Sequence, residues 1–420
     1  MTTNVSPAGS PPGIRLTQTG LIGLCVSLVV TSSLLTHFLG HRASAAFANT
    51  ASAASEILPP PTGELPPWGE LITLDIDLEQ PEEYVSFEAT TDRIATWTFT
   101  NCTLKQTREI LVGSGMSAGL IESTLAADKV EDSPKATIVR PGDEVVIAMP
   151  NEVRAKLYAT LAQWPENRYM ANPYHLPSED FSALLTSKDV LPAALEMLKK
   201  LTYTQAGKRV FSDPEVVLHQ IPTAEGRLHL MKMLTYQTAV LARLRLRPDS
   251  DVDKLLGYWG AMPGVRTKDL RPLLDSIKKT PEGGTISLLY FLPPFARERL
   301  YTFPLPAEAG DVKMDCHWTA MNFFNDTPDP RFQDNAYASN FIKENCYQIG
   351  KPSKVGDLVF LLNSKNEVIH SAVYIADDLV FTKNGINFAQ PWILMRIPNL
   401  REVFTSGEEP KVAYYRRKDS

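Results

Sequence analysis

A single long apolar run sets the first limit on how this chain can fold. Residues 20–40 (GLIGLCVSLVVTSSLLTHFLG) contain no carboxylate, lysine or arginine, and no other long apolar run occurs in the 420 residues. About twenty helical residues are enough to cross a bilayer. We therefore expect one hydrophobic helix near the N-terminus, with the rest of the chain folding as globular domains.

The flanks of this run leave two interpretations open. The tail at 1–19 carries one cation, Arg15, and a small-x-small pattern that suits signal peptidase follows at 43–45. Segment 20–45 is therefore either a cleaved signal peptide or an uncleaved membrane anchor, because Arg42 balances Arg15 and weakens any positive-inside bias. Both interpretations place the bulk of the chain outside the cytoplasm, in the periplasm or cell envelope, either secreted or anchored by the N-terminal helix.

The composition is that of a globular protein that does not bind nucleic acid. Hydrophobic residues make up 44% and charged residues 21% of the chain, which is enough to bury a core. The formal net charge is −6, whereas a nucleic-acid binder needs a basic face for the phosphates. Four cysteines in so long a chain form no disulfide scaffold. No metal site and no cofactor are predicted, because Cys316, Cys346 and the histidines of that segment lack zinc-ligand spacing.

The length allows two or three domains. An Ala/Pro-rich linker is predicted at 46–70, because proline favours an extended chain. A mainly helical domain with a few strands, of unknown role, is predicted at 71–300. Its expected strands lie at 71–78 and, as a pair, within 136–149, and its expected helices at 104–112, 153–163, 181–201, 214–220, 224–246 and 252–259. Nothing in this domain points to a chemistry, and His219 and His229 are interpreted as partly buried histidines.

The pattern around Cys316 points to a nucleophile. Asp315 is a good N-cap for a helix that starts at Cys316 and carries apolar residues such as Phe323. A cysteine at the first helical position meets free N–H groups and the positive end of the helix dipole, which stabilise a thiolate and lower its pKa. From this segment alone, an ordinary buried cysteine in a capped helix remains the alternative.

The base is identified by elimination. Strands at 358–362, 368–376 and 379–382 are expected to form an antiparallel meander, with His370 near the start of the second. A thiol nucleophile needs a base within hydrogen-bond reach. His317 adjoins Cys316 on the helix, where neighbouring side chains diverge by about 100°. His370 is therefore the candidate base.

These features resemble the NlpC-type cysteine peptidases and amidases of bacterial cell walls, which have a papain-like fold. The resemblance covers little more than the last quarter of the chain. It rests on Asp315-Cys316 opening a helix, on the strand GDLVF at 356–360, and on His-x-x-x-Tyr-Ile starting at His370. It implies an α+β fold in which a helix packs on an antiparallel sheet at 301–420, with Cys316 as nucleophile and His370 as base.

The resemblance also implies a third polar residue that orients the histidine from about twelve positions later. Thr382 occupies that position, and Asn384 offers a better acceptor two residues on. Tyr301 stands where the family often has a tyrosine near the substrate amine. Trp318 is interpreted as a core aromatic and is also a candidate substrate contact. His317-Trp318 replaces the family's Ser-Gly, and its substrate-reading arginine and serine motif is not matched.

The sequence thus favours an exported cysteine hydrolase that cleaves peptide or amide bonds. The resemblance suggests the stem peptides of peptidoglycan as substrate. The alternative is a non-catalytic envelope protein whose degenerate papain-like domain binds the wall or a partner, and amide transfer on the same Cys–His pair is a third option. The expected partners are peptidoglycan or a peptide substrate, and the membrane if the N-terminal helix is not cleaved.

Overall fold

The computed structural model describes residues 65–176, 191–205, 207–262, 265, 267–305, 314–385, 389–405 and 408–418. The predicted tail, the signal peptide or anchor, and most of the linker lie outside the described residues, as does the first part of the helix predicted at 181–201. Within these ranges no helix is both long and apolar enough to cross a membrane.

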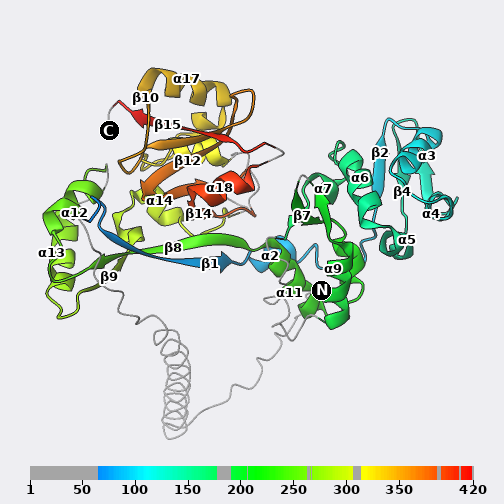
Figure 1. Ribbon diagram of the computed structural model, residues 1–420, viewed down its shortest axis with the longest axis horizontal. Coiled ribbons are helices and arrows are strands. Elements are labelled where there is room, and N and C mark those ends of the chain that lie inside the picture. The colour runs from blue at the N-terminus through cyan, green and yellow to red at the C-terminus, as the bar shows by residue number, and fades with distance from the viewer. Residues whose placement is uncertain are drawn as a thin grey trace, which may run out of the picture. The chain divides into compact units, whose positions relative to one another are not determined.

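The described chain is a mixed α+β protein whose strand ladders are antiparallel (Figure 1). Three small sheets come from residues before 300. They have the strand orders β1(Glu70–Leu78)-β8(Gln237–Leu246)-β9(Gly284–Ser287), β2(Trp97–Thr100)-β4(Ala136–Val139)-β3(Val130–Asp132) and β5(Tyr174–His175)-β7(Lys208–Phe211)-β6(Tyr203–Gln205). A larger sheet follows after residue 345, in the order β10(Cys346–Ile349)-β15(Lys411–Arg417)-β11(Leu358–Leu362)-β12(Val368–Ala376)-β13(Leu379–Lys383)-β14(Trp392–Arg396).

Helices surround the second and third small sheets and share one apolar core with them, which includes Trp97 and Leu157. These helices are α2(Glu82–Val85), α3(Leu104–Gly113), α4(Ala118–Thr124), α5(Asp143–Ala148), α6(Asn151–Leu161), α7(Arg168–Ala171), α9(Pro192–Leu201), α10(Pro214–Leu218) and α11(Ala224–Thr235). The predicted start of α3 is confirmed, because the Thr103 side chain accepts from the backbone N–H of Gln106 in a capping box.

Two predictions in this part are wrong. The helix expected at 224–246 ends at Thr235, and its second half is the strand β8, which pairs with β1 along its whole length (Figure 1). Buried apolar residues recur at every second position of β8, as a half-buried strand requires: Val240, Ala242, Leu244 and Leu246. The second strand expected within 136–149 is instead α5, because Gly142, at φ 82°, turns the chain and the adjacent Val145 and Val146 are both buried.

The sheet after residue 345 contains the predicted meander of β11, β12 and β13, which is confirmed. Helix α16 (Cys316–Met321) packs on one face of β12 and β13, and the other face is covered by α18 (Ile397–Val403) and Phe404. The remaining helices are α12(Val252–Trp259), α13(Thr267–Lys278), η1(Leu288–Phe291), α14(Pro294–Arg299), η2(Pro330–Gln333) and α17(Asn335–Asn345).

The core on the α16 side of this sheet runs across residue 300, where the sequence predicted a domain boundary. It joins residues 240–300, among them Trp259 and Phe291, to Trp318 of α16 and to Val373 of β12. The residues from β8 onward therefore belong with the C-terminal sheet by packing, not with the helices that precede them.

The turn before β11 depends on a glycine. Gly356 has φ +95°, and a Cβ placed there would lie 2.1 Å from the ring of Phe324. The turn presents Asp357, whose carboxylate accepts from the N–H groups of Ser353 and Lys354 and forms an ion pair with Arg416 of β15. The predicted Gly-Asp turn thus fixes where β11 begins beside β15.

Candidate functional site

Cys316 is the first residue of α16, as the sequence predicted. The Asp315 side chain caps this helix by accepting from the backbone N–H of Trp318 at 2.8 Å. The cap holds the helix start against the edge of β12, where the backbone of Ser371 forms a hydrogen bond to the Cys316 sulfur.

The predicted lowering of the thiol pKa is wrong for the described conformation. Cys316 is only 7% exposed. Burial raises the pKa of its thiol to about 11 and outweighs the backbone hydrogen bonds from Ser371, Cys316 and His317, which lower it. The carboxylate of Asp315 adds a smaller rise. At neutral pH the sulfur is therefore a protonated thiol.

His370 is fully buried on β12. Its ring stacks on Phe404, with 4.1 Å between the ring centroids, and its Nε2 lies 2.7 Å from the hydroxyl of Thr382 on β13. Burial lowers the imidazole pKa to about 3, with a smaller contribution from the charge of His317. The ring is neutral at pH 7, and among the described atoms its buried Nδ1 has no hydrogen-bond partner.

His370 and α16 lie on opposite faces of the sheet. His370 pairs with Leu361, and both lie on the face where Ala372 joins the core beneath α18. The aromatic residues of α16 belong to the core on the other face. Within the described part no hydrogen bond joins Cys316 to His370, although the N–H of the next residue, Ser371, reaches the sulfur.

Thr382 and Asn384, the two candidates for the polar residue that orients the histidine, form a chain of hydrogen bonds that starts at the His370 ring. The Thr382 hydroxyl donates to Oδ1 of Asn384 at 3.5 Å. Since a hydroxyl has one hydrogen, Thr382 then accepts from Nε2–H, and the lone pair of the neutral ring lies on Nδ1. This arrangement gives His370 the tautomer that a general base needs.

Sequence reasoning missed Lys383. It is fully buried at the end of β13, and burial lowers its ammonium pKa to about 8, while the nearby Asp315 and Cys316 raise it. Its Nζ donates to the carbonyl of Gly385 at 2.7 Å. A lysine in the otherwise apolar strand LVFTK was the available signal. In a separate contact between α16 and β12, the Nδ1 of His317 lies 2.6 Å from the Ser371 hydroxyl.

Tyr301 and Trp318, the two predicted substrate contacts, make packing contacts in the core. The Tyr301 hydroxyl donates to the carbonyl of Val240 on β8 at 2.6 Å. Trp318 is 2% exposed, and its ring meets Phe295 at a centroid distance of 5.4 Å, with the guanidinium of Arg299 6.0 Å from its ring. The structure thus brings His370, Thr382 and Asn384 together on the face of the sheet beneath α18, and places Cys316 on the opposite face. It assigns the hydroxyl of Tyr301 and the ring of Trp318 to packing contacts.

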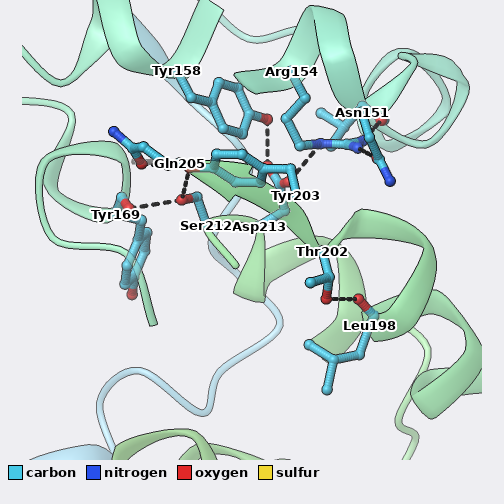
Figure 2. A network of polar contacts seen from close by, with 11 residues as sticks. Asn151, Arg154, Tyr158, Tyr169, Leu198, Thr202, Tyr203, Gln205, Ser212 and Asp213 are labelled. Carbon is cyan, nitrogen blue, oxygen red and sulfur yellow. Dashed lines mark hydrogen bonds and ion pairs between the residues drawn. The ribbon is translucent and has the colours of Figure 1, made fainter. Parts of the chain in front are cut away.

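A second polar site, which sequence reasoning missed, lies in the core that includes Trp97. Figure 2 shows Arg154 and Tyr158 converging on Asp213: the Tyr158 hydroxyl donates to the carboxylate, and Arg154 Nε lies 3.2 Å from it. Ser212 stands between the Tyr203 hydroxyl and the backbone carbonyl of Tyr169. All of these side chains are buried. They hold the start of α10 in place.

A pocket of about 290 Å³ opens beside this network, lined by residues of three segments, 93–96, 166–170 and 212–215. Burial raises the carboxyl pKa of Asp213 to about 6 and that of Glu215 to about 7. The sequence signal was the acidic pair around Pro214, which is more often a helix start than a site.

Comparisons with protein-family models, curated proteins and solved structures found no match. Among the described residues, no three His, Cys, Asp or Glu side chains are placed to hold a metal ion. We therefore infer the function from the geometry of these two sites.

Proposed function

We propose that the protein is an exported cysteine hydrolase that cleaves peptide or amide bonds with Cys316 as nucleophile and His370 as base. The proposal includes a papain-like arrangement of the C-terminal unit. A helix that opens with Cys316 and packs on an antiparallel sheet supports it, as does the contact between His370 and Thr382 twelve residues later on the neighbouring strand.

One observation carries the proposal. The His370 ring has Nε2 engaged by Thr382 and a buried Nδ1 with no partner among the described atoms, one residue from the N–H that reaches the Cys316 sulfur. A buried polar atom without a partner costs about 1–3 kcal/mol, so such atoms are rare and often mark functional sites.

In the proposed reaction the Cys316 sulfur attacks the carbonyl carbon while its proton passes to Nδ1 of His370. The imidazolium then gives this proton to the leaving amine, and water hydrolyses the thioester to restore the thiol. Because His370 and α16 lie on opposite faces of the sheet in the described conformation, the reaction requires the start of β12 to rearrange so that Nδ1 turns to the face of Cys316. The choice of peptidoglycan stem peptides as substrate is based on the family resemblance. The proposal of export is based on segment 20–45.

The test is hydrolysis of muropeptides by the full chain and two cysteine variants. We expect Cys316→Ala to abolish product and the matched variant Cys346→Ala, at another buried cysteine, to retain it. Equal product from the Cys316→Ala variant and the unmodified chain would overturn the proposal.

The second candidate is a non-catalytic binding protein of the envelope. The enclosure of the site favours it: Cys316 and His370 are both buried, and burial leaves both groups neutral at pH 7. Iodoacetamide labelling across pH separates the candidates. Cys316 labelling that develops only above about pH 9, with no muropeptide product, supports the binding protein, whereas labelling near neutral pH supports the hydrolase.

A further inference from the structure

The pocket beside Asp213 has an unusual arrangement of charge. Two of its ionic lining groups, Asp213 and Arg168, are matched within the protein. Arg154 pairs with Asp213, and Arg168 pairs with the buried Glu88 at 2.6 Å. The amide of Asn167 is fully engaged by the backbone of Thr98 and Leu161. These groups form the framework of the pocket and have little capacity left for a ligand.

Three ionic lining groups remain, of which Glu166 is exposed and accepts from the Thr100 hydroxyl. The other two, Glu215 and Arg93, carry opposite charges. Glu215 is 8% exposed, and Arg93 holds its guanidinium 5.6 Å from the centre of the Tyr169 ring. Among the described residues neither has an ion-pair partner within 4.0 Å. The charge of Arg93 nevertheless acts on the Glu215 carboxyl, so the two groups face the same space without touching.

Part of the remaining lining is apolar, beside the polar residues Thr96 and Ser212. Ile94, Ala95 and Met170 supply hydrocarbon surface, and the ring of Tyr169 forms a flat wall. A volume of about 290 Å³ suits a molecule of amino-acid or dipeptide size. An anion alone would leave the buried Glu215 unmatched, although a buried charge needs a partner. A cation alone would leave the half-buried Arg93 without a counter-ion.

We propose that this pocket, which we call the Arg93–Glu215 pocket, binds a small zwitterion of the amino-acid or dipeptide class. The ammonium group lies against the Glu215 carboxylate and the ligand carboxylate against the Arg93 guanidinium, where a fork of N–H donors matches two oxygens. An aliphatic side chain packs against Ile94 and Met170. This inference goes beyond the proposed hydrolase and does not depend on Cys316.

The test is calorimetric titration of the full chain with three probes: alanyl-alanine, its N-acetyl derivative and its C-terminal amide. We expect alanyl-alanine to bind and each cap to weaken binding by about tenfold or more, because each removes one charge-assisted contact. This comparison uses the unmodified protein, so it stands whether or not any variant folds.

Variants assign each end of the ligand. In Glu215→Gln we expect acetylation to lose most of its effect, and in Arg93→Gln we expect amidation to do so. Glu152→Gln, at an exposed carboxylate that does not line the pocket, is the control and should bind like the unmodified chain.

Three results would overturn the proposal. They are no binding of alanyl-alanine at millimolar concentration, equal binding of all three probes, and tight binding of one capped probe, which would indicate a site for a cation or an anion alone. The Cys316→Ala variant should bind alanyl-alanine normally, so the result is separable from that of the muropeptide assay.

Discussion

The Nε2 of His370 lies 2.7 Å from the hydroxyl of Thr382 on the neighbouring strand. This contact crosses from β12 to β13 on the face of the sheet beneath α18, and the Thr382 hydroxyl in turn donates a hydrogen bond to Oδ1 of Asn384. Among the described residues it is the only hydrogen bond to the imidazole, so its loss is expected to change both the stability of the fold and the tautomer of His370.

We expect Thr382→Val to lower the free energy of unfolding by about 1–3 kcal/mol, because it leaves Nε2–H buried without an acceptor while keeping the side-chain shape. Urea denaturation measures the change. Thr285→Val, at an exposed position in β9, is the control and should stay within about 0.5 kcal/mol. Nitrogen NMR of His370 should also show a mixture of tautomers in Thr382→Val. An unchanged tautomer would contradict the proposed orientation.

A second prediction concerns the buried ammonium of Lys383. Burial lowers its pKa to about 8 in the folded state, below its ordinary value of 10.5. The unfolded chain therefore binds more protons than the folded one between about pH 8 and 10.5, and stability rises with pH across this window. The full effect is at most roughly 3 kcal/mol.

Urea denaturation between pH 7 and 10 measures this slope. Lys383→Met should remove it, and Lys365→Met, in an exposed turn, should leave it unchanged. A Lys383→Met variant with the same pH slope as the unmodified chain would show that the ammonium of Lys383 is not the group responsible.

The features that the sequence predicted correctly depend on residues close together in the chain. Thr103 and Asp315 each cap the helix that follows within three residues. The meander of β11 to β13 is marked by short turns and by alternating apolar side chains. Local propensity and capping chemistry are sufficient for such elements.

The features that the sequence did not predict depend on contacts between distant residues. Strand β8 forms because β1 pairs with it, which overrides the helical appearance of 224–246. The thiol pKa of Cys316 is set by burial rather than by its place on the helix. The position of His370 beneath Phe404 and the approach of Arg93 to Glu215 likewise follow from tertiary packing that no local pattern encodes.

A third prediction concerns the turn that opens β11. Gly356→Ala places a Cβ 2.1 Å from the Phe324 ring at a backbone φ of +95°, so both the contact and the conformation are unfavourable. We expect a loss of about 2–4 kcal/mol in the free energy of unfolding. Gly350→Ala is the matched control, since no described atom lies within 4 Å of its Cβ. Equal stability of the two variants in urea would show that the turn relaxes freely.

A final prediction concerns Glu215 and pH. Burial raises its carboxyl pKa to about 7 in the folded state, above its ordinary value of 4.5. The neighbouring groups act in both directions: Arg93 lowers this pKa, and Asp213 and Glu88 raise it. The folded chain binds more protons than the unfolded one between about pH 4.5 and 7, so the contribution of Glu215 to stability falls as pH rises through this window.

The loss amounts to at most roughly 3 kcal/mol. Glu215→Gln keeps the shape but removes the titration, so it should be more stable than the unmodified chain at pH 8 and about equally stable at pH 4. Glu166→Gln, on the exposed rim of the same pocket, should show no such crossover. Because alanyl-alanine would bring an ammonium group to this carboxylate, it should recover part of the lost stability at pH 8 in the unmodified chain and not in Glu215→Gln. Thermal denaturation at the two pH values measures all of these differences, and parallel curves for the Glu215 and Glu166 variants would contradict the assignment.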